Sequence, residues 1–236
     1  MSELITEEKE NILKPIAVGN LLLQENGEPV FKFFIPSYQR GYRWDEGQVT
    51  DLLDDFLEFI ITSKSKEDKY CLQPIVVKKL EDERYEVLDG QQRLTTIFIL
   101  LSRLKKTNNE IDLFQLEYET RPDSASFLKE GLNGTINTKN PDYFYISSAY
   151  KTIDKWLIET KHQKANISSS LFNTIVESIE FIWYEIVKDT DAIDVFTRIN
   201  IGKIPLTNAE LVKAVFLSKN NLSLGAASEE INDTNF

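Results

Sequence analysis

The sequence contains a single cysteine, Cys71, and a single histidine, His162. One cysteine excludes an internal disulfide bond and suits a reducing cytoplasm, which is where we expect the protein to act. One histidine leaves a zinc site, a Ser-His-Asp triad and a histidine-based nuclease site without their parts. The GxxxxGK[ST] sequence of P-loop proteins is also missing. We expect Cys71 to be a small buried residue and His162 to be exposed and incidental.

Positive charge and long apolar runs are also scarce. The formal net charge is −11, with 27 Lys and Arg against 38 Asp and Glu, so any contact with DNA has to be local. No stretch approaches the ~20 apolar residues of a membrane span, and the acidic N-terminus lacks the apolar run of a signal peptide. We therefore expect no membrane partner. The 236 residues, 42% of them hydrophobic, suffice for one sizeable core.

The segment Asp89–Arg93, Asp-Gly-Gln-Gln-Arg, lies where a strand pattern at 84–88 gives way to a helical one. A helix N-terminus presents unpaired N–H groups and a partial positive charge, which together favour anions. Gly90 lets a ligand approach the backbone, and Arg93 supplies a planar fork for phosphate oxygens. Asp89 could hold a magnesium ion or orient a water, and the two glutamines suit a polar ligand. The alternative is a capped helix with solvated glutamines.

A second cluster precedes this motif, in the segment Phe34–Trp44. It places three aromatic residues and two arginines after a proline that discourages helix. Aromatic faces stack on bases, and guanidinium groups bind phosphate. The alternative is structural, with Tyr42 and Trp44 docked on the core and the arginines paired with carboxylates around Asp45 and Asp51.

Apolar periodicity predicts a mixed fold of the α+β class. The segments expected in chain order are a short helix near 17–23, an extended segment at 30–35, a helix at 48–61 capped by Asp45, a hairpin of 74–80 and 84–88, the helix after Arg93, a strand at 113–119, a short helix at 126–130, a connection at 131–142, helices at 147–160 and 170–180, a strand at 181–187, a helix from 191, and a helix at 207–219 opened by a capping box.

The order of these motifs resembles the N-terminal domain of GmrSD-type modification-dependent restriction proteins, a family marked by the DGQQR motif and related to the ParB and sulfiredoxin fold. The matching segments are Ile35–Arg40 with Tyr42 and Trp44, Val87–Thr96, Tyr118–Ser124, Trp156, Phe196–Asn200 and Pro205–Thr207. The resemblance spans roughly residues 15 to 218. It implies a small mixed sheet with packed helices in residues 1–108, and a mainly helical lobe in 109–236 that returns one strand to the same compact unit.

The resemblance also implies nucleotide binding and hydrolysis in defence against foreign or modified DNA. With the residue chemistry above, it predicts a site for a nucleoside triphosphate and Mg²⁺, the metal being held by Asp89. The candidate catalytic residues are Asp89, Gln91, Gln92 and Arg93. The candidate nucleotide-binding residues are Tyr38, Gln39, Arg40, Gly90, Arg93, Thr95, Arg198 and Asn200. The candidate DNA contacts are Tyr42, Arg43 and Trp44.

Two other functions remain open at this stage. The same pocket could bind a nucleotide or a modified base only to change shape, as a switch without turnover. A ParB-like DNA nuclease is the weaker alternative, because acidic clusters suited to two metal ions are not evident. Arg198 has its own structural alternative, an ion pair with Asp194 or Glu210.

The sequence predicts that this chain alone does not cut DNA, because an HNH-type nuclease needs a histidine as general base beside its metal ligands. We expect the nuclease to be a separate domain or subunit. Plasmid carrying modified or unmodified cytosine, incubated with the protein, magnesium and nucleotide, should stay intact. Reproducible cleavage that is lost in Asp89→Ala would place the nuclease within these 236 residues.

Overall fold

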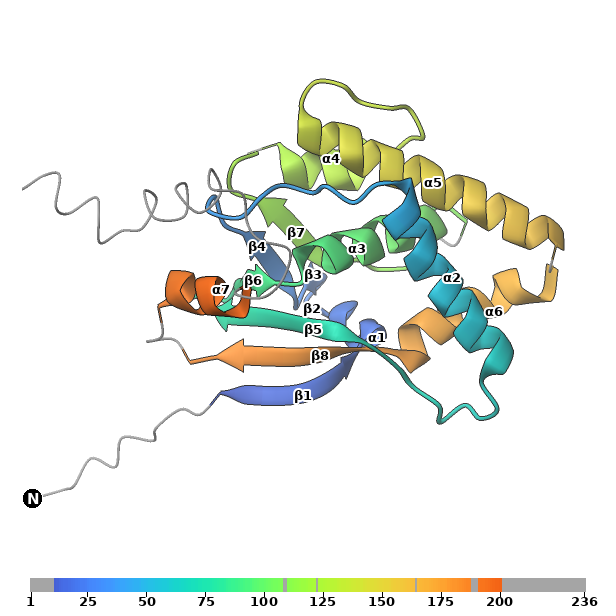
Figure 1. Ribbon diagram of the computed structural model, residues 1–236, viewed down its shortest axis with the longest axis horizontal. Helices are drawn as coiled ribbons and strands as arrows, with labels where there is room; N and C mark the ends of the chain where they lie inside the picture. Colours follow the sequence, from blue (N-terminus) through green and yellow to red (C-terminus); the bar gives the residue numbers. More distant parts are fainter. Residues whose placement is uncertain (1–10, 108–109, 122, 164, 188–190, 201–236) are drawn as a thin grey trace, which may run out of the picture.

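A computed structural model describes residues 11–107, 110–121, 123–163, 165–187 and 191–200 (Figure 1). These residues form one six-stranded mixed sheet, a two-stranded hairpin and seven helices. The prediction of an α+β fold is therefore confirmed. The expected helix at 207–219 lies outside the described residues, and the predicted division at residue 108 stays a prediction.

The large sheet has the order β1-β8-β5-β6-β4-β7. Its strands are β1 (Ile12–Ala17), β4 (Lys32–Ile35), β5 (Tyr70–Lys79), β6 (Tyr85–Asp89), β7 (Gln115–Tyr118) and β8 (Ile179–Ile186). Strand β4 runs parallel to both β6 and β7, whereas β5 is antiparallel to β6. The carboxyl ends of β4, β6 and β7 therefore meet at one edge of the sheet, which is the edge where open α/β sheets bind ligands.

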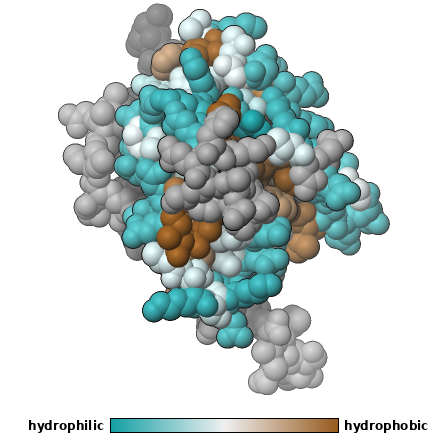
Figure 2. Space-filling view, turned by 90° about the vertical axis from the view of Figure 1, so that its right-hand side faces the viewer, coloured by the Kyte–Doolittle hydropathy of each residue, from teal (hydrophilic) through white to brown (hydrophobic). Residues whose placement is uncertain are grey.

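Most of the helices lie on one side of the sheet, and the small hairpin consists of β2 (Gln24–Glu25) and β3 (Glu28–Pro29) (Figure 1). The helices are α1 (Val18–Leu21), α2 (Glu46–Thr62), α3 (Gln91–Lys105), α4 (Ser124–Glu130), α5 (Pro141–Gln163), α6 (Ala165–Ser178) and α7 (Ala192–Asn200). Figure 2 faces the end of the molecule where α5 leads into α6, and exposed apolar residues lie there among hydrophilic ones. None of the described helices is both long and apolar enough to cross a membrane.

The two faces of the sheet bury two separate hydrophobic clusters. Val87 belongs to the large core that also contains buried residues of α2, α3, α5 and α6. The next residue, Leu88, belongs to a small cluster with Val76, Tyr38 and Phe196 of α7. Successive residues of a strand point to opposite faces, so α7 covers the face opposite to the large core.

The most regular elements follow from local sequence. Helix α2 buries Val49, Leu52, Leu53 and Phe56, one face of a helix. Its predicted cap is confirmed as a capping box, in which Asp45 Oδ1 accepts from the Gln48 backbone N–H at 3.3 Å and Gln48 Oε1 accepts from the Asp45 N–H at 3.1 Å. The predicted hairpin corresponds to β5 and β6.

Two expectations need correction. Cys71 is exposed, not buried, because its neighbour Leu72 points into the large core and Cys71 points to the opposite face, where α7 packs farther along the sheet. Strand β1 was not expected, since four of its six residues are exposed and it contains Pro15; it is an edge strand that pairs only with β8. The side chain of His162 lies outside the described part of the structure.

Core packing can be tested with two isoleucines on different helices. Ile97 of α3 is fully buried, whereas Ile158 of α5 is 45% exposed. Ile97→Ala should lower the free energy of unfolding by roughly 2–5 kcal/mol, through lost burial and a cavity. Ile158→Ala should change it by no more than about 0.5 kcal/mol. Urea denaturation of both variants measures the difference, and equal losses would contradict the assignment of Ile97 to the core.

Candidate functional site

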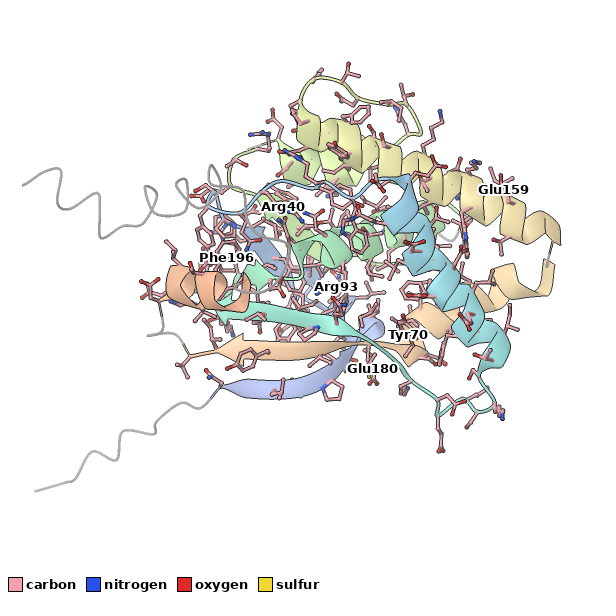
Figure 3. All side chains as sticks on the ribbon, viewed as in Figure 1. Arg40, Tyr70, Arg93, Glu159, Glu180 and Phe196 are labelled. Atoms are coloured by element: carbon pink, nitrogen blue, oxygen red, sulfur yellow. The ribbon has the colours of Figure 1, made fainter. Side chains whose placement is uncertain are left out.

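The two sequence motifs lie together at the carboxyl edge of the parallel strands. The aromatic and basic loop follows β4, Gly90 and α3 follow β6, and Arg121 follows β7. Figure 3 labels Arg40 and Arg93, which come from the first two of these segments. The loop and the DGQQR motif are joined by hydrogen bonds from Gln91 and Gln92 to the loop backbone, and their sharing of one ligand site stays a prediction.

Gly90 forms a sharp turn between β6 and α3. Its φ of +91° is left-handed, a conformation that costs other residues free energy. A side chain here would also be crowded, because a Cβ would lie 3.0 Å from the Pro74 carbonyl oxygen and 3.2 Å from Ile75 Cα. Helix α3 has no side-chain cap, and its first helical hydrogen bond is Leu94 N–H to the Gly90 carbonyl. The backbone N–H groups before Leu94 thus have no acceptor within the helix.

The two glutamines of the motif bind the loop, not solvent. Gln91 Nε2 donates to the Arg40 carbonyl at 2.6 Å. Gln92 uses both ends of its amide, since Nε2 donates to the Gly41 carbonyl at 3.1 Å and Oε1 accepts from the Arg43 backbone N–H at 2.9 Å. Both side chains are buried, and Gln91 Oε1 has no hydrogen-bond partner among the described residues. The glutamines therefore fix the backbone of the loop against the first turn of α3.

Arg93 is held by neutral oxygens. Its Nη1 donates to Gln73 Oε1 at 2.7 Å and its Nη2 to the Pro74 carbonyl at 2.8 Å. Its Nε–H is buried and has no acceptor in the described chain. Burial lowers the pKa of Arg93 below its ordinary value, and the charge of Asp89 opposes this shift. Asp89 itself is half-buried at the end of β6.

Arg43 belongs to a cluster that sequence reasoning missed. The buried carboxylate of Asp142 forms ion pairs with Arg43 through Oδ1 and with Arg121 through Oδ2, the second at 2.9 Å. It also lies directly against Gly41, where a Cβ would be only 1.9 Å from Oδ1. The expectation that the loop arginines pair near Asp45 is thus corrected for Arg43. The only sequence signal for Arg121 was its place in a matching family segment.

Tyr38 and Gln39 are buried beside β6. The Tyr38 hydroxyl donates to Glu86 Oε1 at 3.0 Å, and its ring packs edge-on against Phe196 at 5.3 Å between centroids. Burial, followed by the charge of Glu86, raises the pKa of Tyr38. Gln39 Nε2 donates to the Val87 carbonyl. Both side chains therefore hold the loop on the sheet, and nucleotide contact by either stays a prediction.

Tyr42, Trp44 and Thr95 also pack inward. Tyr42 is fully buried and its hydroxyl lies 2.9 Å from Thr96 Oγ1. Thr95 is equally buried, with Oγ1 2.7 Å from the Tyr118 hydroxyl. Trp44 is partly buried against the large core. In this conformation Tyr42 offers DNA no surface, and Thr95 offers a nucleotide none, because both side chains are enclosed by protein.

Arg40 is the exposed residue of the loop. Its guanidinium makes no hydrogen bond or ion pair with a described residue. Within the described part of the chain it is thus available to a ligand, whereas the side chains of Tyr38, Gln39 and Tyr42 are buried. Arg198 and Asn200 belong to α7 by their backbone, but their side chains lie outside the described part, so their predicted roles stay predictions.

Magnesium would need oxygen ligands at this edge. Among the described residues no group of three or more His, Cys, Asp and Glu side chains could hold a metal ion. Asp89 could therefore hold Mg²⁺ only where phosphate oxygens and water complete its coordination. A separate cavity of about 450 Å³ lies between the ends of α2 and α6, and none of the predicted site residues lines it.

The Gln92 bridge can be tested by proteolysis and unfolding. Gln92→Met removes both hydrogen bonds to the loop, which should cost about 1–3 kcal/mol of unfolding free energy because buried backbone groups lose their partners. Trypsin should then cut after Arg40 or Arg43 faster than in the wild type. Gln115→Met is the control, since the Gln115 amide makes only a 3.5 Å contact with Glu117. Unchanged cleavage and stability in Gln92→Met would contradict this role.

Comparison with protein-family models matches residues 18–217 to the model described as the N-terminal domain of the GmrSD restriction endonuclease. The matched range includes both motifs, the Asp142 cluster and every strand of the large sheet except β1. A search of curated proteins found no match. Because the family model covers most of the chain, the protein belongs to the family of GmrSD restriction endonuclease N-terminal domains.

Proposed function

We propose that this chain is the nucleotide-binding sensor module of a restriction system that defends against foreign DNA. The observation that carries the proposal is that the Arg93 guanidinium has only neutral hydrogen-bond acceptors among the described residues. Its guanidinium is partly buried, donates its hydrogen bonds to neutral oxygens, and keeps a buried Nε–H that has no acceptor among the described residues. Buried charges are normally paired, so the site favours an anion.

The surroundings of Arg93 favour phosphate as that anion. The first turn of α3 offers backbone N–H groups and the positive end of the helix dipole. Gly90 leaves the turn without a side chain. Arg40 supplies a second guanidinium, which is exposed and bonded to no described residue. Two guanidiniums and a helix N-terminus would neutralise a large part of the charge of a triphosphate.

Hydrolysis is the finer part of the proposal. Phosphoryl transfer depends mainly on positioning and on neutralising charge, which arginines and a helix end can supply. Asp89 is the residue we assign to an attacking water, and with phosphate oxygens it could also hold Mg²⁺, which would neutralise charge on the phosphates. Arg93 would bind the β or γ phosphate.

A switch without turnover is the second candidate, and a specific observation favours it. Both ends of the Gln92 amide, and Nε2 of Gln91, are already hydrogen-bonded to the loop backbone. Only Gln91 Oε1 remains to position a water. If the glutamines keep these bonds when ligand is bound, the motif would bind nucleotide without aligning a nucleophile, and the loop would carry the signal.

The partners follow from the family. The family description assigns this domain to a restriction endonuclease. We therefore propose a nuclease domain or subunit as the partner, and modified DNA as the signal that the whole system senses. Nucleotide at the α3 site would then control when the nuclease acts.

Arg93→Ala should weaken nucleotide binding while leaving the fold intact. Hydrogen bonds to charged groups contribute about 1.5–3 kcal/mol, so the affinity should fall roughly ten- to hundredfold. Titration calorimetry with each nucleoside triphosphate measures this. The control is Arg103→Ala on the same helix, where Arg103 pairs with Asp154 away from the motif. Equal affinities in Arg93→Ala and wild type would leave Arg93 a structural residue.

Turnover separates the enzyme from the switch. If Asp89 orients the water, Asp89→Asn should retain nucleotide binding and lose phosphate release in the presence of magnesium. Released phosphate is measured over time for wild type, Asp89→Asn and Arg93→Ala at saturating nucleotide. Wild-type protein that binds nucleotide but releases no phosphate would establish the switch in place of the enzyme.

A further inference from the structure

We infer that Arg43 and Arg121, held together by the carboxylate of Asp142, form a second phosphate-binding pair beside the α3 site. The inference goes beyond the proposed nucleotide site because it depends on different side chains. The ligand chemistry is a phosphate group, which could come from the tail of a bound nucleotide or from the backbone of a DNA strand.

One buried acid holds both arginines. The Asp142 side chain is 3% exposed, whereas those of Arg43 and Arg121 are 33% and 34% exposed. Each carboxylate oxygen faces a different guanidinium. Arg43 Nη1 also donates to the Tyr42 carbonyl, and Arg121 Nη1 to the Thr120 carbonyl, both at 2.6 Å. The Nη2 groups of both arginines make no hydrogen bond to the rest of the described chain.

The charges of this cluster do not balance. Two guanidiniums share one carboxylate, which leaves one positive charge in excess in a chain whose net charge is −11. A purely structural pair would need only one arginine. Guanidinium groups bind phosphate oxygens with two parallel N–H bonds, and each of these side chains is about one third exposed. A phosphate group would therefore satisfy both the geometry and the charge.

Several contacts besides the ion pairs hold the pair in place. Asp142 lies against Gly41, so any side chain at position 41 would displace it. The Arg43 guanidinium lies over the Tyr145 ring at 5.4 Å, and the Arg43 backbone is tied to Gln92 at the start of α3. Groups that are already ordered lose less entropy on binding. The same bonds place the pair next to the α3 site, so one extended ligand could reach both.

Arg84 provides the matched control. It contacts two carboxylates, those of Asp82 and Glu117, and its guanidinium lies 4.6 Å from the centre of the Phe34 ring. Its side chain is 30% exposed, close to the values for Arg43 and Arg121. Its charge is more than neutralised, so it should not bind phosphate even though it resembles both arginines in exposure and Arg43 in having an aromatic neighbour.

The test compares Arg43→Gln, Arg121→Gln and Arg84→Gln in the full chain. Three probes are used: inorganic tripolyphosphate and non-hydrolysable nucleoside triphosphate analogues by calorimetry, and a labelled DNA duplex by fluorescence anisotropy at several salt concentrations. Arg43→Gln and Arg121→Gln should each lower the affinity for the probe that the pair binds by roughly ten- to hundredfold. Arg84→Gln should leave all three affinities unchanged. Thermal unfolding checks that each variant is folded.

Asp142→Asn distinguishes positioning from simple charge. Removing a negative charge should strengthen phosphate binding if only electrostatics matter. If Asp142 positions the two guanidiniums, binding should weaken instead. Arg121→Lys covers the case in which Asp142→Asn fails to fold, because lysine keeps the charge and loses the planar fork. Weaker binding in Arg121→Lys supports the pair, and full affinity in it opposes the pair.

The outcomes separate this inference from the proposed function. If Arg93→Ala weakens the nucleotide analogues and neither pair variant weakens any probe, the pair is overturned and the nucleotide site stands. If the pair variants weaken only DNA and the wild type binds no nucleotide, the pair stands and the proposed function fails. If the pair variants lose affinity only for the nucleotide analogues, the triphosphate is the source of the phosphate group. Wild-type protein that binds no probe overturns both.

Discussion

The position of the loop after β4 depends on one side-chain amide, that of Gln92. By donating to the Gly41 carbonyl and accepting from the Arg43 N–H, it pairs with the loop backbone much as a neighbouring strand would. A loop at this edge has no strand beside it, so buried polar groups of its backbone need such a partner. Two more glutamines add hydrogen bonds. Gln91 of the motif donates to the Arg40 carbonyl in the loop, and Gln39 of the loop donates to the Val87 carbonyl in β6.

This arrangement leaves the arginines to face outward. The glutamines and tyrosines carry the internal contacts, so Arg40, Arg43 and Arg121 keep exposed surface at the edge, while Arg93 lies deeper against Pro74. The guanidinium groups differ in which nearby groups neutralise their positive charge. Arg40 has no acid among the described residues, Arg43 and Arg121 share Asp142, and Arg93 has neutral partners with Asp89 nearby. Four arginines therefore lie at this edge of an acidic protein, and the charge of each is neutralised to a different degree.

Local features of the fold could be predicted from the sequence, but the distant contacts could not. The spacing of apolar residues and the Asp45 cap predicted α2, and the β-branched and alternating apolar residues predicted β5 and β6. These signals lie within a few residues of the elements that they predict. The ion pair of Arg43 with Asp142 joins residues 99 positions apart, and no local pattern announces it. The glutamines show another limit: a polar side chain suits a ligand and a buried carbonyl equally, and only the fold decides which one it meets.

The same loop contacts both faces of the sheet. Its backbone is bonded to α3, which packs in the large core, while the Tyr38 ring packs against Phe196 of α7 on the opposite face. Tyr38 and Leu88 belong to one small cluster with α7, and Leu88 directly precedes Asp89 of the motif. Because side chains in such a cluster are closely packed, a shift of one of them displaces its neighbours. A movement of the loop that displaced Tyr38 would therefore change its contact with Phe196, which would connect the candidate site to α7.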